Sequence, residues 1–250
     1  MVCLAAVLAL VTPQPSPTAS PPNPARAQQI DASLLYESHF AGDVIFNGSA
    51  RYDLAAQGAV LPYAELIAGY DTRSGVPGIG EVYNENAIIP SFGFRAPFGE
   101  EQYAELFLQG GYSFGLRGQY SFPETRWGFD YDRDYGSSFR SDYPHAEVTG
   151  NLTLYSRFAG NLIGYAAAYY DTRLATWLRA MVGADASFDD HREYDNNYAE
   201  AYAGFMVPFS PVLDLRLAGV EATYLSRGVD VPKPASYSSV RISLVHSSPP

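Results

Sequence analysis

Apolar and polar residues alternate along most of the chain, and no window of ordinary helix length keeps an apolar repeat of 3.6 residues. In the segment 176–188, for example, the even positions are apolar from Leu178 to Phe188, whereas the odd positions include Arg179 and Asp185. A period of two places the two kinds of residue on opposite faces of an extended strand. The pattern therefore predicts an all-β protein.

The predicted strands are long, at about 9–13 residues, whereas strands of soluble proteins average about 5–6 and membrane-spanning strands need about 9–11. The candidates are 32–40, 43–54, 60–72, 87–97, 101–112, 114–122, 125–134, 145–158, 161–172, 176–188, 197–208, 212–226 and 237–245. Single-chain bacterial barrels have an even number of strands, so we expect 32–40 or one of the glycine-rich segments not to span. The prediction is an antiparallel up-and-down transmembrane β-barrel of about 12 strands, within a range of about 10–14.

Three predicted strands share the sequence Tyr-Ala-Glu, with glutamates at Glu65, Glu105 and Glu200. Each glutamate falls on the face opposite the apolar stripe of its strand. A charge on the lipid face of a barrel costs up to a few kcal/mol, whereas a charge facing a wet lumen stays hydrated. The repeated glutamates therefore favour a barrel with an aqueous interior.

Charged residues of both signs occupy the polar faces of the other predicted strands, and we expect them in the lumen. In a narrow barrel, opposed charges can plug the lumen through ion pairs or line a selective channel, and a tyrosine-rich lumen also suits sugars. The luminal candidates are Arg51, Asp53, Glu65, Glu105, Arg126, Asp130, Asp132, Arg157, Arg179, Asp185, Glu200, Asp214, Arg216 and Arg241.

The predicted strand 212–226 changes parity along its length, because Asp214 and Arg216 are even and Glu221 is odd. A bulge near Gly219 would return Glu221 to the polar face. A position of Glu221 beyond the bilayer would explain the change equally well, and the sequence leaves both explanations open.

The N-terminal region differs in composition from the rest. Met1–Val11 is apolar, about as long as a signal-peptide core and too short to span a bilayer, and Ala25–Ala27 fits the cleavage rule. We expect 1–27 to be a signal peptide with a proline-rich segment, and 28–250 to be a single barrel domain. A disordered cytoplasmic tail is the alternative, since no positive charge precedes the apolar core.

Composition excludes some classes of function. The net charge of −11 gives no basis for nucleic-acid binding, and the 20 Tyr and 14 Phe favour strands and interfaces. The single cysteine, Cys3, lies in the predicted signal peptide, so a disulfide scaffold is excluded.

Candidate chemistry is sparse. The histidines are His39, His145, His191 and His246. None is at metal-ligand spacing from another His or Cys, so neither a metal site nor a cofactor is predicted. His246 stands beside Ser247, which is the visible candidate for a lipid-modifying barrel enzyme. The acidic segment 189–197 could bind a divalent cation, but it is more typical of a hydrated surface loop.

A narrower resemblance rests on the Tyr-Ala-Glu strands, on RWGFDYDRDYG at 126–136 and on LDLRLAGVEATYLSRG at 213–228. These segments resemble the C-terminal barrel domain of the NfrA-type phage-adsorption outer-membrane proteins, over about residues 60–228. Related barrels belong to exopolysaccharide export systems. The resemblance implies a surface receptor or an export role, with polysaccharide as ligand and a periplasmic export partner.

The sequence thus predicts a non-enzymatic protein of the Gram-negative outer membrane, which acts as a porin-like channel, a polysaccharide-export-associated channel or a surface receptor. The expected partners are outer-membrane lipid and either polysaccharide or small solutes, and not nucleic acid. One alternative is a secreted, soluble, lectin-like β-sandwich in which the apolar stripes face each other. The other is an outer-membrane lipid-modifying enzyme.

Overall fold

The computed structural model describes residues 28–38, 42–55, 58–72, 86–98, 103–116, 120–156, 160–190, 197–225 and 236–247. Within these ranges the chain forms strands and turns, and none of it is a helix long and apolar enough to cross a membrane. The predicted signal peptide, 1–27, lies outside the described residues. The strands are β1 (Gln28–Glu37), β2 (Asp43–Asp53), β3 (Leu61–Asp71), β4 (Ala87–Phe98), β5 (Tyr103–Gly115), β6 (Phe122–Tyr135), β7 (His145–Tyr155), β8 (Asn161–Ala175), β9 (Leu178–Asp189), β10 (Tyr198–Ser210), β11 (Leu213–Tyr224) and β12 (Ser236–His246).

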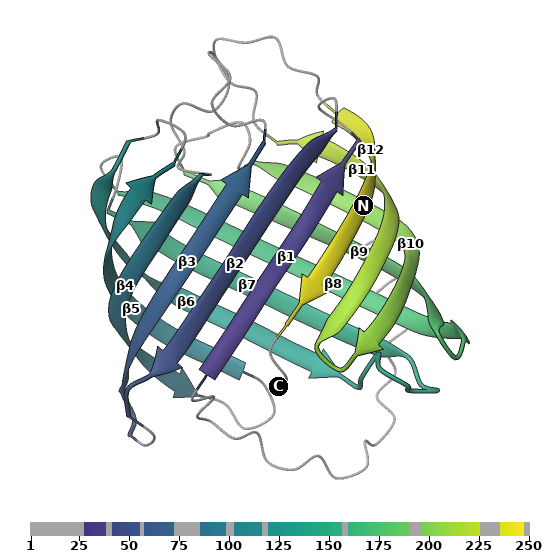
Figure 1. Ribbon diagram of the computed structural model, residues 1–250, viewed down its shortest axis with the longest axis horizontal. Helices are drawn as coiled ribbons and strands as arrows, with labels where there is room; N and C mark the ends of the chain where they lie inside the picture. The colour runs from purple at the N-terminus through teal and green to yellow at the C-terminus, as the bar shows by residue number, and fades with distance from the viewer. Residues whose placement is uncertain are drawn as a thin grey trace.

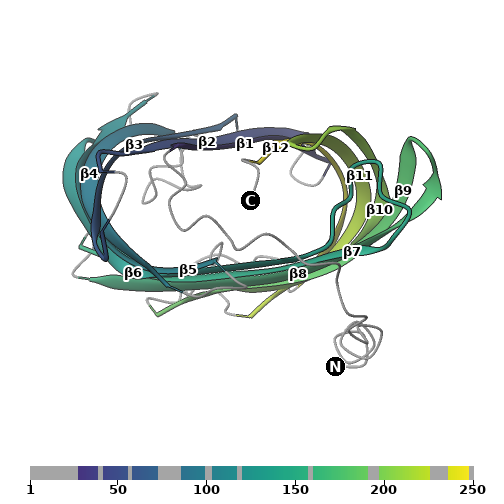
Figure 2. The same ribbon diagram turned by 90° about the horizontal axis from the view of Figure 1, so that it is seen from below.

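The strands form one closed antiparallel barrel, in which each strand pairs with its neighbours in sequence. The barrel closes where β1 pairs with β12, from Ala32 opposite His246 to Glu37 opposite Arg241. The strands are tilted (Figure 1), and the barrel is flattened when it is viewed from below (Figure 2). The predicted up-and-down barrel is confirmed, and the β-sandwich alternative is wrong because the sheet closes on itself.

Most predicted strands agree with the structure to within a few residues at each end, and two regions differ in a way that affects the strand count. The segment 32–40, suspected of not spanning, overlaps β1, which runs from Gln28 to Glu37. The predicted strands 101–112 and 114–122 are replaced by the single strand β5, which ends at Gly115, and Phe122 already begins β6. Tyr112 and Phe114, on the two sides of the predicted break, keep the outward parity of one continuous strand. This merger reduces the predicted strands to the even number that a barrel requires.

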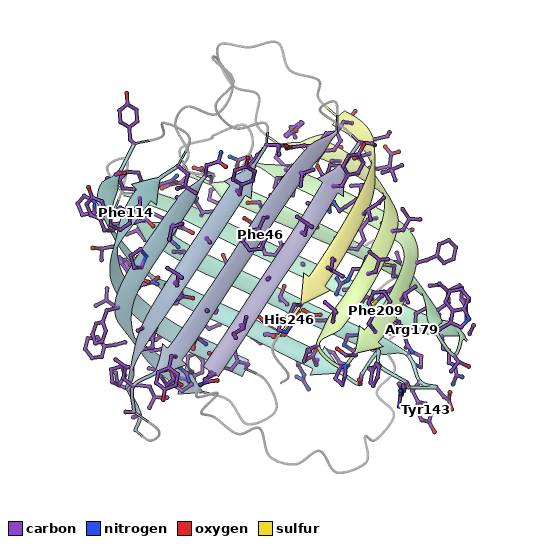
Figure 3. All side chains as sticks on the ribbon, in the orientation of Figure 1. Phe46, Phe114, Tyr143, Arg179, Phe209 and His246 are labelled. Carbon is purple, nitrogen blue, oxygen red and sulfur yellow. The ribbon has the colours of Figure 1, made fainter. Side chains whose placement is uncertain are left out.

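The outward face of the barrel is apolar. On β5, Leu106 and Leu108 are 56% and 51% exposed, whereas the intervening residues face inward and Glu105 on the same strand is 1% exposed. Phe46, Phe114 and Phe209 project from the outer surface (Figure 3). Every strand contributes a large exposed apolar side chain: Ile30, Phe46, Leu66, Phe92, Leu106, Trp127, Leu152, Leu174, Val182, Phe205, Leu217 and Ile242.

This surface is typical of a membrane-spanning barrel. Soluble proteins rarely expose a contiguous apolar patch of more than a few hundred Å², whereas membrane barrels carry an apolar band around their whole circumference. The buried side chains of the interior are correspondingly rich in charged residues, including Asp53, Arg95, Asp171 and Arg179. The molecule is therefore apolar outside and polar inside, which is the reverse of a soluble protein.

The two ends of the barrel differ. Strand β1 begins and β12 ends at the same end, at the lower edge of Figure 1, and the shortest connections, 176–177 and 211–212, are also there. The longest connections, 72–86 and 225–235, are at the other end. We refer to these as the terminal end and the loop end. In bacterial barrels the short turns are periplasmic and the longer loops extracellular.

The position of Glu221 is now settled. Strand β11 pairs with β10 and with β12 in continuous register through Gly219, so there is no bulge at that point. Glu221 therefore faces outward, near the loop end of β11, whereas Asp214 and Arg216 face inward. The register shift that the structure does show lies elsewhere, between Pro208 and Ser210 of β10.

Candidate functional site in the barrel lumen

The predicted luminal residues lie on the inward face of their strands, apart from Arg157, which lies outside the described residues. The alternation of each strand sets this orientation, because side chains of equal parity share a face. Their role in function stays a prediction. What the sequence could not give is which charges meet, and the structure groups them into three clusters.

The first cluster joins β2, β4 and β5 toward the terminal end. Arg95 donates from Nε to Oδ1 of Asp53 at 2.8 Å and from Nη2 to Oδ2 at 2.5 Å, and its Nη1 lies 3.1 Å from Oε2 of Glu105. Arg51 donates from Nη1 to Oε1 of Glu105 at 2.6 Å. Glu105 thus lies between two arginines, and Tyr103 donates a hydrogen bond to it as well. A buried carboxylate needs such partners, because desolvation without them is costly.

The neighbouring polar residues extend this cluster into the lumen. The Nη2 atom of Arg51 donates to Gln29 at 2.6 Å, and its guanidinium lies 5.5 Å from the ring centroid of Tyr63. Glu65, on β3, accepts a hydrogen bond from Gln109 at 2.5 Å. The Tyr-Ala-Glu glutamates of β3 and β5 are therefore held by different partners.

The second cluster lies toward the loop end, around Arg241 of β12. Its Nε donates to Glu37 at 2.6 Å, its Nη2 donates to Glu200 at 3.0 Å, and its Nη1 pairs with the other oxygen of Glu200. Asp185 is the direct cross-strand partner of Glu200, which places two carboxylates side by side. Among the described residues, Oδ1 of Asp185 has no hydrogen-bond partner.

The third cluster lies at the terminal end, around the buried carboxylate of Asp171 on β8. One oxygen of Asp171 accepts from Nε of Arg179, and the other lies 2.9 Å from Nδ1 of His145. The two Nη atoms of Arg179 donate to the carbonyls of Ser141 and Tyr143, each at 2.8 Å. Figure 3 shows Arg179 and Tyr143 at the same corner of the barrel. Arg179 therefore links the β6–β7 connection to strands β8 and β9 of the barrel.

The remaining predicted residues line the lumen between these clusters. Arg126 pairs with Glu124, and its guanidinium lies 5.0 Å from the ring centroid of Tyr155. Arg216 donates to Asp214 from Nε at 2.7 Å. Asp130 and Asp132 border the internal cavities described below.

Sequence reasoning missed several members of the clusters. Arg95 is among the most deeply buried side chains of the protein, yet it was not proposed as luminal. Its odd parity, opposite to that of outward Phe92 and Phe94, was the available signal. Asp171 was not proposed as luminal either, although it shares the inward parity of Tyr169.

Carboxylates outnumber arginines on the inward face of the described strands. The inward carboxylates are Asp31, Glu37, Asp43, Asp53, Glu65, Asp71, Glu105, Glu124, Asp130, Asp132, Asp134, Glu147, Asp171, Asp185, Asp189, Glu200 and Asp214. The inward arginines are Arg51, Arg95, Arg126, Arg173, Arg179, Arg216 and Arg241. The formal charge of the described inward face is therefore negative.

Two internal cavities adjoin each other in this lumen. The smaller, of about 150 Å³, is lined by residues that include Glu65, Arg126 and Thr153. The larger, of about 360 Å³, is lined by residues that include Asp31, Asp132, Asn151 and Tyr165. Arg51, Glu105 and Asp130 border both cavities. The larger cavity lies between β1–β2 and β5–β8, and the smaller one extends from it toward β3.

The other candidates for chemistry are less well placed. Nδ1 of His246 lies 3.1 Å from the carbonyl oxygen of Ile30, so this ring nitrogen is directed at the backbone. In the acidic segment 189–197, Asp189 is buried and accepts a hydrogen bond from Asn161 at 3.2 Å. Residues 191–196, which include His191, lie outside the described part of the chain, as does His39.

Comparisons with known proteins give a likeness of architecture. No protein-family profile matches the chain, and no curated protein has a significantly similar sequence. The β domain of the Bordetella autotransporter BrkA is 14% identical, with a TM-score of 0.41, over 88% of this chain and 98% of that one. An outer-membrane channel from Pseudomonas putida F1 is 8% identical, with a TM-score of 0.43, over 92% and 100%. The outer-membrane channel DcaP of Acinetobacter baumannii is 12% identical, with a TM-score of 0.41, over 87% and 71%. These values define no family for the chain, and its resemblance to NfrA-type barrels stays a prediction.

Proposed function

We propose that the protein is a channel of the bacterial outer membrane whose lumen admits small solutes and favours cations. The apolar side chains on the outside of all the strands support the membrane location, because lipid is the solvent that such a band requires. Closure of the barrel supports it as well, since a spanning sheet must leave no unpaired edge in lipid.

The observation that carries the cation preference is the lining of the larger cavity. Asp31, Asp130 and Asp132 border it, together with the ion pair of Arg51 and Glu105. Acidic rings select cations in other channels, because they lower the electrostatic energy of a positive ion in a narrow passage. The excess of inward carboxylates over arginines extends the same potential along the lumen.

The ion pairs named above between described residues join strands that are close together in the strand order of the barrel. Arg51 and Glu105 belong to β2 and β5, and Arg241 of β12 reaches Glu37 of β1 and Glu200 of β10. These strands are at most three positions apart around the barrel. The two cavities that remain beside the Arg51–Glu105 pair favour a conducting lumen over one that is plugged by its own side chains.

Reversal potentials test the proposal. The purified protein, reconstituted in a planar lipid bilayer under a KCl gradient, is expected to conduct with a reversal potential of the sign set by potassium. Folded protein is recognised on a denaturing gel, where an unboiled sample migrates differently from a boiled one. Absence of conductance from such folded protein, or a reversal potential of the sign set by chloride, would overturn the proposal.

The inward tyrosines support a second candidate, the passage of neutral sugars or of polysaccharide. Tyr63 and Tyr155 line the smaller cavity, and Tyr103 and Tyr165 line the larger one. Aromatic faces and hydroxyl groups together suit the apolar faces and the hydroxyls of sugars. Oligosaccharides added to the bilayer chamber would then block the potassium current in a concentration-dependent way, whereas unaffected current would contradict this second candidate.

A further inference from the structure

We propose that the terminal end of the lumen holds a binding site for one divalent transition-metal cation, formed by Asp134, His145 and Glu147. Asp134 of β6 and Glu147 of β7 are direct cross-strand partners, and His145 precedes Glu147 by two residues on the same face. One oxygen of each carboxylate and one ring nitrogen lie within 4.8 Å of one another. The site is separate from the two cavities and does not depend on conductance.

The contacts of His145 leave its Nε2 atom available as a metal ligand. Its Nδ1 lies 2.9 Å from Oδ2 of Asp171, which is fully buried and is held from the other side by Arg179. A carboxylate is an acceptor, so Nδ1 must carry a proton and donate it. In a neutral imidazole this leaves a lone pair on Nε2. A carboxylate behind a ligating histidine is the usual support of a metal-bound imidazole.

The lone pair of Nε2 would face another acceptor, because Oδ1 of Asp134 lies 3.3 Å away. This separation exceeds the usual 2.7–3.2 Å of a hydrogen bond to nitrogen. Two donors that are each about 2.0–2.1 Å from a tetrahedral zinc ion are about 3.4 Å apart. The spacing of Nε2 and Oδ1 therefore fits two ligands of one ion, which would also remove the repulsion between the two acceptors.

The third donor, Glu147, lies close to other carboxylates, whose repulsion a bound cation would reduce. The negative charges of Asp132 and Asp134 act on its carboxylate, opposed by Arg216 and by any positive charge on His145. Among the described residues, Glu147 accepts no hydrogen bond. The side chain of Asp134 is 33% exposed, so an ion can enter from solvent. One imidazole and two carboxylates suit Zn²⁺ and its first-row neighbours, with a fourth position for water.

The competing explanation is an imidazolium that is held between Asp134 and Asp171 with no metal. Titration of Zn²⁺ into tag-free protein in detergent, followed by calorimetry, separates the two explanations. We expect one Zn²⁺ per chain, and Co²⁺ in its place should give the visible absorption of a four-coordinate ion. If no Zn²⁺ binds to the wild-type protein, the imidazolium explanation holds and the proposal fails.

Variants locate the ion. His145→Asn and Glu147→Gln should each weaken Zn²⁺ binding at least about tenfold, and Asp171→Asn, which changes a positioning residue, by about 10–100-fold. His246→Asn is the matched control, because it removes an imidazole at the same end of the barrel, and it should leave binding unchanged. Equal loss in His246→Asn, or none in His145→Asn and Glu147→Gln, would overturn the proposal.

The folded state of each variant is checked by its unboiled migration on a denaturing gel. Should His145→Asn not fold, Glu147→Gln and Asp171→Asn still decide the outcome. Metal binding is measured in detergent, so it succeeds or fails independently of the conductance that tests the channel.

Discussion

Arg95 donates two hydrogen bonds to the carboxylate of Asp53, at 2.8 and 2.5 Å, and the side chains of both residues are almost completely buried. They are brought together by the barrel, because β2 and β4 flank β3. A bidentate arginine–carboxylate pair is stronger and more directional than a single hydrogen bond. Replacement of either residue leaves the charge of the other buried without its partner.

Arg95→Ala should therefore destabilise the barrel. A buried pair that loses one partner typically costs about 3–5 kcal/mol, and Arg95 also serves Glu105. Urea unfolding in lipid vesicles, followed by tryptophan fluorescence, measures the change. Arg173→Ala is the control, since its pair with Asp142 is far more exposed and should contribute about 0–1 kcal/mol. Similar losses for the two variants would contradict the assignment.

A charge on the outward face of β5 should be costly. Leu108→Arg places a guanidinium near the middle of the strand on the lipid side and is expected to cost about 2–4 kcal/mol. Asn47→Arg places the same charge near the middle of β2 on the inward face, where water is available, and should change stability little. Unfolding in vesicles of defined lipid compares the two. If Asn47→Arg were the more damaging variant, the two faces would be reversed.

Gly204 of β10 should not tolerate a larger side chain. A Cβ atom at this position would meet the backbone of Leu217 and Ala218 on the neighbouring strand, whereas a Cβ at Gly219 would meet nothing within 4 Å. Overpacking of this kind costs about 1–3 kcal/mol. Gly204→Ala is thus expected to lower the unfolding free energy and Gly219→Ala to leave it nearly unchanged. Equal effects would mean that the packing between β10 and β11 is looser than described.

The cation preference should depend on Asp130 and Asp132. Both are inward and border the larger cavity, so the double variant Asp130→Asn, Asp132→Asn removes two negative charges from its lining. The ratio of potassium to chloride permeability, taken from reversal potentials, should fall. Glu221→Gln is the control, because Glu221 faces outward on β11 and its neutralisation should not alter the ratio. An unchanged ratio in the double variant would remove Asp130 and Asp132 from the selectivity mechanism.

The strands and their faces could be predicted because a period of two depends on local sequence alone. Glu105 and Glu200 fall on the inward side for that reason. The partners could not be predicted, because they depend on register between strands. Arg95 and Asp53 are 42 residues apart, and Asp134 meets Glu147 only through the β6–β7 pairing. The proposed metal site depends on that pairing, so the sequence alone did not indicate it.

Local patterning was also insufficient where glycine interrupts it. The sequence suggested a break within β5 and left a bulge near Gly219 of β11 as one of two explanations, yet both strands continue through their glycines. An antiparallel neighbour on each side supplies the hydrogen bonds that keep a glycine extended. The signal peptide at 1–27 and the luminal position of Arg157 stay predictions.

The junction of β1 with β12 has a consequence for biogenesis. Six cross-strand pairs, Ala32–Glu37 with Arg241–His246, link the first strand to the last. Until β12 has been synthesised and has paired with β1, the two edge strands of the sheet carry unpaired backbone N–H and C=O groups, which hydrocarbon cannot solvate. Single strands therefore cannot insert into the membrane one after another, and other factors must protect the unpaired strand edges until β12 pairs with β1. Deletion of Ser236–His246 should abolish accumulation of the protein in membranes.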